Sequence, residues 1–266
     1  MSADDEDHRA AGRAPRLFVE ADLAANALIR LNEAQSGYLT QVLRLGAGDA
    51  VLVFNGREGE WRASIAQTGK RRYELCLIDR SRLQICGSDI HYLFAPLKRA
   101  RLDYMVQKAV EMGVSELRPV MTRRTVAERV NLHRMRANAI EAAEQCGVLH
   151  VPAIREPTEL GRVLDHWDAS RPLIFCDEAA RIADPLKALG RLRSKSLGSP
   201  TAVALLIGPE GGFSPEERQR LLSLPFVAAI SLGPRIMRAD TAAVAALALV
   251  NAVLGDWSER DEVKGL

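Results

Sequence analysis

Short, mostly apolar runs alternate with longer amphipathic stretches along the last two thirds of this 266-residue chain. Such runs are typical of strands that are buried on both faces of a parallel sheet. They comprise residues 91–97, 114–121, 173–176, 203–207 and 227–232. Residues 101–112 and 133–146 instead place apolar side chains at helical spacing, and a glycine follows each stretch. The alternation of strands and helices predicts an α/β sandwich.

The first third of the chain has the pattern of a small β-rich domain. Strands are expected at residues 17–19, 50–54, 61–66 and 71–78, and a helix at 36–44. The segment 83–90 contains a Gly-Ser-Asp turn and is the expected linker. The predicted domains are therefore 16–83 and 89–258. Residues 1–15 are acidic and lack an apolar stretch, so we expect a disordered tail rather than a signal peptide.

Two loops near the C-terminus each lead from a predicted strand into a predicted helix. In the first, Gly208-Pro209-Glu210-Gly211-Gly212 allows a tight turn and a close approach of the backbone to a ligand. Ser214 then provides an N-cap, Pro215 suits the first helical position, and Glu217 completes a capping box.

The second loop, 233–239, precedes an alanine-rich helix, 241–254, for which Asp240 or Thr241 is the expected cap. Because the carboxyl ends of parallel strands meet at one edge of a sheet, the two loops predict a ligand-binding crevice beside helix N-termini. A simple strand-to-helix turn remains the alternative for the first loop, because it matches neither the dinucleotide nor the P-loop fingerprint.

Composition narrows the class of protein. Hydrophobic residues make up 47% and charged residues 26%, an ordinary globular balance. The apolar run 242–250 is much shorter than the roughly 18 residues of a membrane span. The four cysteines form no C-x-x-C pair, and the five histidines include no H-E-x-x-H motif. We therefore expect a cytoplasmic protein with reduced thiols, no metal site and no membrane partner.

Positive charge is concentrated in one segment. Residues 98–136 contain ten lysines and arginines against four carboxylates, a net charge of +6, whereas the whole chain carries only +2. Clustered positive charge is the electrostatic footprint of binding to a phosphate backbone. A solvated basic face is the alternative interpretation.

The paired loops GPEGGFS and LGPRIMRADTAA closely resemble the cofactor-binding motifs of the SPOUT superfamily of S-adenosylmethionine-dependent RNA methyltransferases. Within that superfamily, the chain resembles the bacterial 16S ribosomal RNA uracil-N3 methyltransferase family from residue 16 to about residue 255. The segments that carry this resemblance are RLFV (16–19), YLTQVLRLGAGD (38–49), VFNG (53–56), LKRARLDYMVQKAVEMGVSELRPV (97–120) and AAEQCG (142–147).

The resemblance implies a small N-terminal PUA-like β-barrel that binds RNA and a C-terminal SPOUT α/β domain. It also implies that the helix 241–254 is threaded through a loop as a trefoil knot, and that the active protein is a homodimer. The implied partner is 16S ribosomal RNA or the small ribosomal subunit. The implied reaction moves the methyl group of S-adenosylmethionine to N3 of a uridine.

The donor sulfonium is already activated by its positive charge, so this reaction needs neither a metal nor a covalent nucleophile. Loss of the N3 proton leaves negative charge on O2 and O4 of the uracil, and Arg238 is the expected group that stabilises it. Arg238 contacting a phosphate or a carbonyl is the alternative. Glu210 and Asp240 are candidate bases with competing structural roles, and deprotonation by water is equally compatible.

The expected cofactor site consists of backbone groups from both loops and apolar walls from their flanking residues. Its members are Phe175, Cys176, Ile207, Gly208, Pro209, Glu210, Gly211, Gly212, Ser231, Leu232, Gly233, Ile236, Met237, Arg238, Thr241 and Ala242. The expected RNA contacts are all basic: Arg16, Arg44, Lys98, Arg101, Lys108, Arg123 and Arg124.

Three segments depart from the family pattern. The motif that commonly reads R-T-E-T-A is Arg238-Ala239-Asp240-Thr241-Ala242 here, while Val148 replaces an arginine and Arg123 an acid. These departures affect details of RNA contact and leave the cofactor loops intact. A SPOUT ribose 2′-O-methyltransferase and a non-catalytic RNA-binding or ribosome-assembly factor are the alternative functions. A degenerate cofactor loop would favour the non-catalytic factor.

Overall fold

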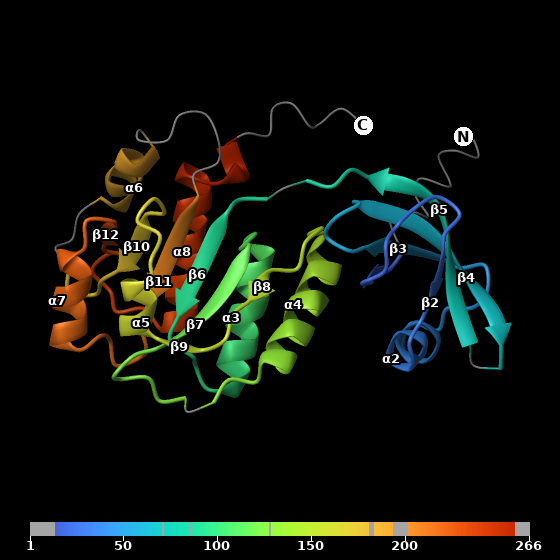
Figure 1. Cartoon of the computed structure of the whole chain (residues 1–266), viewed down its shortest axis with the longest axis horizontal. Coiled ribbons are helices and arrows are strands. Elements are labelled where there is room, and N and C mark those ends of the chain that lie inside the picture. The colour runs from blue at the N-terminus through green and yellow to red at the C-terminus, as the bar shows by residue number, and fades with distance from the viewer. Residues whose placement is uncertain are drawn as a thin grey trace. The chain divides into compact units, whose positions relative to one another are not determined.

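The computed structural model describes residues 14–70, 72–85, 87–127, 129–180, 184–193 and 202–258. The chain forms two compact units (Figure 1). The first comprises residues 1–86 with 143–150, and the second comprises residues 87–142 with 151–266. Most of the predicted tail, residues 1–13, lies outside the described residues, as do Arg71 in the expected strand and Cys86 in the expected linker.

The first unit is built on a five-stranded sheet with the strand order β1-β3-β4-β5-β2. Its strands are β1 (Arg16–Phe18), β2 (Leu28–Arg30), β3 (Ala50–Phe54), β4 (Glu60–Gly69) and β5 (Arg72–Arg82). Only β1 and β3 are parallel, and the other pairs are antiparallel. Alternate residues such as Val51, Val53 and Leu75 are fully buried in one apolar core. The predicted small N-terminal sheet is confirmed, but β2 was not expected from the sequence.

The predicted helix at 36–44 is two shorter elements, and its start was wrong. Helix α2 (Glu33–Gly37) begins after Asn32, whose side chain accepts a hydrogen bond from the Gln35 amide at 2.8 Å. The side-chain oxygen of Gln35 in turn accepts a bond from the Asn32 amide, which completes a capping box and starts the helix earlier. The chain then widens into the π-helical turn η1 (Tyr38–Val42).

The second unit is built on a parallel seven-stranded sheet with the order β12-β10-β11-β6-β7-β8, and β9 also pairs with β7. The strands are β6 (Ile90–Phe94), β7 (Glu116–Met121), β8 (Ala153–Ile154), β9 (Thr158–Glu159), β10 (Leu173–Cys176), β11 (Val203–Ile207) and β12 (Val227–Ile230). Every residue of β11 is buried, as a central strand covered on both faces requires. All five predicted strands of this domain are present.

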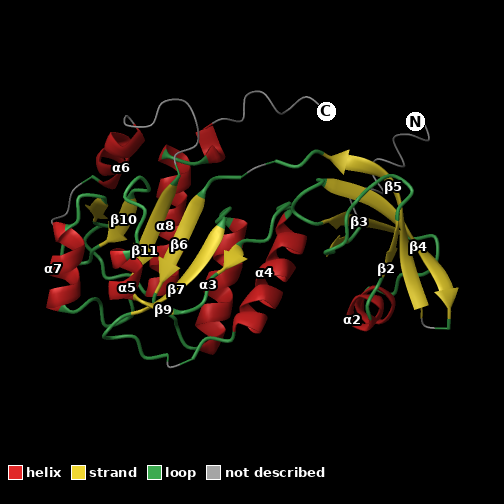
Figure 2. Ribbon diagram, viewed as in Figure 1, coloured by secondary structure: helices red, strands yellow, loops and turns green. Residues whose placement is uncertain are grey.

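Helices flank this sheet (Figure 2). They are α3 (Arg99–Glu111), α4 (Leu132–Cys146), α5 (Leu160–Asp165), α6 (Pro185–Arg193), α7 (Pro215–Ser223), α8 (Ala239–Val253) and the 3₁₀ turn η2 (Asp256–Ser258). Helix α8 packs against β11, α3 and α6, while α7 packs against β12. Helices α5 and α6 were not predicted. None of the helices in the described ranges combines the length and apolar character that a membrane crossing requires.

The predicted cap of the last helix was wrong. Arg238, not Asp240 or Thr241, is the N-cap residue: its backbone is extended, and its carbonyl accepts a hydrogen bond from the Ala242 amide at 2.8 Å. Asp240 lies inside the first turn, where its carboxylate accepts a bond from the Thr241 amide instead. The cap at α7 is as predicted, because Ser214 and Glu217 form the capping box.

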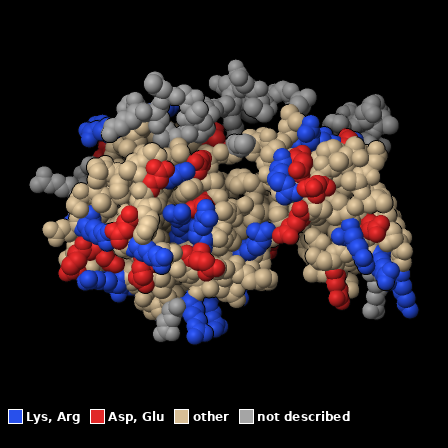
Figure 3. Space-filling model, in the orientation of Figure 1, with Lys and Arg blue, Asp and Glu red and all other residues tan. Residues whose placement is uncertain are grey.

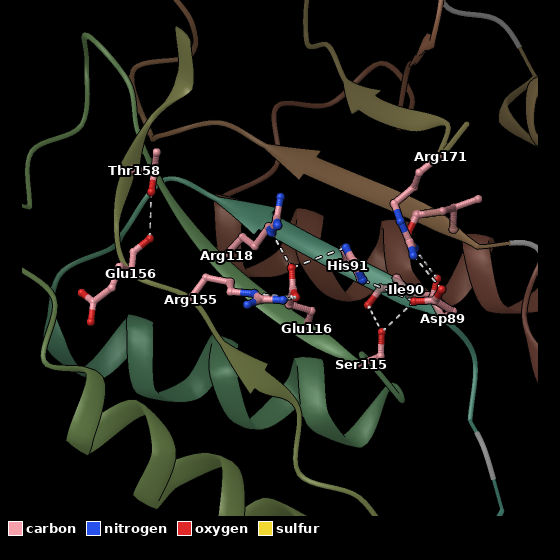
Figure 4. Close-up of polar contacts among 11 residues, drawn as sticks. Asp89, Ile90, His91, Ser115, Glu116, Arg118, Arg155, Glu156, Thr158 and Arg171 are labelled. Carbon is pink, nitrogen blue, oxygen red and sulfur yellow. Dashed lines mark hydrogen bonds and ion pairs between the residues drawn. The ribbon is translucent and has the colours of Figure 1, made fainter. Parts of the chain in front are cut away.

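A polar cluster lies at the amino-terminal edge of the sheet (Figure 4). The buried Glu116 accepts bonds from Arg118 and Arg155 and contacts Nδ1 of His91 at 3.4 Å. Asp89 contacts Nε2 of His91 at 3.3 Å. Burial raises the pKa of Glu116, but the bond from Arg155 and the neighbouring positive charges outweigh it, so the net shift is downward. The cluster keeps a buried carboxylate ionised.

Candidate functional site

Three neighbouring strands deliver their following loops to one edge of the sheet. Strand β10 lies between β12 and β11, all three are parallel, and they end at Ile230, Cys176 and Ile207. The segments that follow border a cavity of about 900 Å³. The cavity therefore lies where the sequence predicts a ligand crevice.

Most of the predicted cofactor residues line this cavity. They are Cys176, Ile207, Gly208, Pro209, Glu210, Gly212, Ser231, Leu232, Gly233, Ile236, Met237 and Ala242. Phe175 is fully buried behind the lining, with its ring 5.1 Å from that of Phe213 in an edge-to-face arrangement. Gly211, Arg238 and Thr241 lie beside lining residues and are exposed to solvent.

Gly212 is the glycine of the first loop that the backbone geometry requires. Its amide donates to the Pro209 carbonyl at 2.8 Å, which closes a turn, and its φ is +68°. An L side chain is strained at this φ, and a Cβ at this position would collide with the carboxylate of Glu178. Gly212 thus lets the loop approach the end of β10 closely.

Sequence reasoning missed a group of charged and aromatic residues that also line the cavity: Arg124 as a lining residue, Asp177, Glu178, Phe213, Arg218 and Arg235. Asp177 is buried and accepts two hydrogen bonds of 3.0 Å from Nε of Arg218 and one of 2.8 Å from Nη2. Asp177 and Glu178 come directly after β10, and that position was the available signal. Arg218 carries no such signal, because only the packing of α7 brings it to the cavity.

The two motif carboxylates are already engaged with other groups. Glu210 forms an ion pair with Arg101 of α3, and Nε of the same arginine lies 3.7 Å from a carboxylate oxygen of Asp240. Arg124 donates to the Gly211 carbonyl at 2.7 Å. Burial raises the pKa of the Cys176 thiol to about 12, so this thiol stays protonated at neutral pH.

The basic residues predicted to contact RNA have different environments. Arg16 points into the first unit: Nε bonds Glu60 at 2.6 Å, and the other nitrogens donate to carbonyls of Ala143, Glu144 and Val148. Its side chain is only 11% exposed, so the expectation that Arg16 contacts an RNA phosphate is dropped. Arg44 and Lys98 are exposed to solvent.

Many cations of the basic segment have carboxylate partners. The pairs are Arg101 with Glu210 and Asp240, Lys108 with Glu111, Arg118 with Glu116, Arg123 with Glu216, and Arg134 with Asp103. Lysines and arginines are correspondingly interleaved with acidic side chains on the face drawn in Figure 3. Glu210, Asp240 and Glu216 lie outside the segment, so its net charge of +6 overstates its free positive charge.

The cavity lining is partly apolar and partly charged, and its charged residues include the arginines 124, 218 and 235 besides carboxylates. Leu232, Ile236 and Met237 provide apolar walls, while Glu178 and Glu210 provide negative charge. Glycines in both loops allow a ligand to approach the backbone closely. Within the described part of the chain, no group of three or more His, Cys, Asp and Glu side chains has the arrangement that a metal ion needs.

Comparison with known proteins identifies relatives of both units. Residues 86–251 match the model of an RNA methyltransferase domain, and residues 31–75 match that of an RNA methyltransferase PUA domain. The ribosomal RNA small subunit methyltransferase E of Rickettsia conorii is 30% identical over 92% of this chain and 97% of its own length.

Two solved structures are similar over nearly their whole length. The ribosomal RNA small subunit methyltransferase E of Neisseria gonorrhoeae, bound to S-adenosylmethionine, is 25% identical with a TM-score of 0.79, covering 92% of this chain and 100% of that one. The methyltransferase Lpg2936 of Legionella pneumophila, also in complex with this cofactor, is 28% identical with a TM-score of 0.77, covering 92% and 99%.

Proposed function

The chain belongs to the ribosomal RNA small subunit methyltransferase E family, and from this premise we propose that it methylates N3 of a uridine in 16S ribosomal RNA. It is an S-adenosylmethionine-dependent ribosomal RNA methyltransferase. The observation that carries the proposal is the cavity at the carboxyl edge of β10, β11 and β12. The two loop motifs that carry the family resemblance, GPEGGFS and LGPRIMRADTAA, meet there.

The residues present fit the cofactor. Adenine would lie against Leu232, Ile236 and Met237, and backbone groups of residues 208–212 and 231–237 would bond its polar atoms. Glu178, an exposed residue of the lining, would face the positive charges of the cofactor. When bound, S-adenosylmethionine supplies the electrophilic methyl group, so this chain's residues need only align the reactants and manage one proton.

Arg238 is the group that we assign to the uracil anion. It is exposed, follows the cavity residue Met237 and is the N-cap residue of α8, where the helix adds partial positive charge. Its guanidinium can donate to the planar acceptors O2 and O4 as the N3 proton leaves. The N3 proton lies on the Watson–Crick edge, so the target uracil must be unpaired or flipped out.

Proton removal by water is favoured over either motif carboxylate. Glu210 is paired with Arg101, and Asp240 accepts a bond from its neighbour Thr241 and lies near the same arginine. Either carboxylate would have to give up a contact within the protein before it could take the proton. We assign the N3 proton to solvent and the stabilisation of the resulting anion to Arg238.

Four further features belong to this proposal: closure of the N-terminal sheet into a PUA-like barrel, a trefoil knot involving α8, a cytoplasmic location and a homodimer. The family resemblance supports each of them. The homodimer has a second support in Ile236, a cavity residue whose side chain is 91% exposed in the single chain. A second copy that covers this side chain would remove apolar surface from water.

Nucleoside mass spectrometry tests the function. The protein is incubated with S-adenosylmethionine and unmethylated small ribosomal subunits, and the RNA is digested. We expect N3-methyluridine with the natural protein and a loss of at least about 100-fold in rate with Arg238→Ala, the usual effect of removing one charge-stabilising group. Arg193→Ala, a change to an exposed arginine of α6, is the control and should keep full activity.

The alternative functions predict other products. A 2′-O-methylated nucleoside would show that the chain is a ribose methyltransferase. RNA binding with no methylated product would favour a non-catalytic assembly factor. An unchanged rate in Arg238→Ala would leave the reaction intact and remove Arg238 from its assigned role.

A further inference from the structure

Arg101 contacts both loops of the cofactor site from outside the cavity. It lies in the first turn of α3, away from either loop in the sequence. Its Nη1 forms an ion pair with Glu210, a cavity-lining residue of the first loop. Its Nε lies 3.7 Å from Oδ2 of Asp240, which follows the second loop in the first turn of α8. One guanidinium therefore joins the segments that carry the two motifs.

The bridge is shielded from solvent at Asp240 and open to solvent at Glu210. The side chain of Asp240 is only 16% exposed, that of Arg101 is 32% exposed and that of Glu210 is 52% exposed. Two carboxylates that share one cation repel each other when the cation is removed. Without Arg101, the two segments would separate or Glu210 would turn into the cavity. Either change would alter the surface on which the cofactor binds.

The other ion pairs of α3 have different surroundings. Lys108 pairs with Glu111 in the same helix. Oδ1 of Asp103 accepts a hydrogen bond of 2.9 Å from Nε of Arg134 in α4. Neither pair includes a residue that lines the cavity. Among the α3 ion pairs in the described residues, only those of Arg101 involve the segments of the two loops.

We propose that Arg101 is a positioning residue for S-adenosylmethionine: by pairing with Glu210 and Asp240, it fixes the two cofactor loops relative to each other. This inference rests on the proposed function only in taking that cofactor as the ligand. It replaces the sequence-based expectation that Arg101 contacts an RNA phosphate. Arg101 is engaged with protein carboxylates and acts on the cofactor rather than on the RNA.

Isothermal titration with S-adenosylmethionine, without RNA, tests the proposal. Arg101→Gln should raise the Kd of the cofactor about 10-fold, because both loops lose a charge-assisted contact. Arg101→Lys should recover part of the loss, since an ammonium can pair with one carboxylate but cannot present a planar fork to two. In the double variant with Glu210→Gln, the two effects should be less than additive.

The control variant is Arg134→Gln, which makes the same charge change and breaks the ion pair with Asp103 of the same helix. Its cofactor Kd should equal that of the natural protein. Circular dichroism checks the fold of each variant. If Arg101→Gln does not fold, the Kd of Arg101→Lys decides, and a value equal to the natural one would overturn the proposal.

RNA binding separates this role from the alternative one. If Arg101 contacts a phosphate, Arg101→Gln would leave the cofactor Kd unchanged, weaken RNA binding and reduce its log–log salt slope by about 1. That result would overturn the proposal. The titration does not depend on which atom is methylated, so an absence of N3-methyluridine would refute the proposed function without deciding the role of Arg101.

Discussion

Gly212 combines two constraints that no other residue type satisfies together. Its φ of +68° strains any L side chain, and the carboxylate of Glu178 occupies the space that a Cβ would need. We expect Gly212→Ala to lower the free energy of unfolding by about 1–2 kcal/mol and to weaken cofactor binding at least about 10-fold, because the backbone becomes strained and the exposed Glu178 carboxylate must turn away from the new Cβ. Urea unfolding and isothermal titration measure the two effects.

Gly113 is the matched control for backbone strain alone. Its φ is +75°, similar to that of Gly212, but a Cβ there would meet nothing within 4 Å. Gly113→Ala should therefore cost about 1 kcal/mol of stability without changing the cofactor Kd. Equal loss of cofactor affinity in both variants would show that general destabilisation, and not the collision with Glu178, controls the site.

Helix α7 depends on its cap in a way that reaches the cavity. The hydroxyl of Ser214 accepts a bond from the Glu217 amide at 3.2 Å and donates to Glu216 at 2.8 Å. Ser214→Ala should cost about 1 kcal/mol in urea unfolding, the usual loss for an N-cap. Because α7 carries Arg218 to Asp177, cofactor affinity should fall as well. Ser214→Thr keeps a capping hydroxyl and should restore both values; failure to do so would contradict the capping role.

Strands β6 and β7 hold a histidine whose titration should affect stability. Burial lowers the pKa of His91 below its ordinary value of 6.5, against the opposing charge of Glu116. The pKa of His91 is therefore lower in the folded protein than in the unfolded chain. At a pH between the two, the unfolded chain binds the proton better, so the free energy of unfolding should fall as the pH drops below about 6.5. One group contributes a slope of at most about 1.4 kcal/mol per pH unit.

The variant His91→Gln removes this titration. Its unfolding free energy, measured by urea between pH 7 and pH 5, should depend less on pH than that of the natural protein. Glu116, whose pKa is shifted below its ordinary value of 4.5, contributes stability that is lost only at lower pH. Identical slopes for both proteins between pH 7 and pH 5 would show that His91 is not the source.

At the scale of the whole molecule, the proposed homodimer has a direct test. Ile236 is 91% exposed in the single chain, and a charge at this position would oppose burial against a second copy. Ile236→Asp should shift sedimentation at micromolar concentration from dimer to monomer. Val42→Asp, a similar change to an exposed residue of the first unit, should leave the dimer intact. A natural protein that sediments as a monomer would refute the homodimer.

Features that depend on residues close together in the sequence were predictable from it. Strands β10 and β11 have the predicted bounds, and Ser214 with Glu217 forms the predicted capping box. Most residues of both loops line the cavity, because strand ends and glycine turns follow from local backbone preferences and apolar patterning. The starts of α2 and α8 were exceptions: the capping box of Asn32 and Gln35 was missed, and Arg238 caps α8 through its backbone conformation alone.

Only the tertiary structure decided which distant side chains meet. Arg16 and Arg101 read as surface arginines, yet the first lies among backbone carbonyls and the second between two cofactor loops. Likewise, packing of α7 places Arg218 on Asp177. Periodicity and turn motifs specify the backbone locally, whereas an ion pair depends on how separate elements fold together. The sequence therefore determined where the cavity lies, and the tertiary structure determined which charged side chains meet around it.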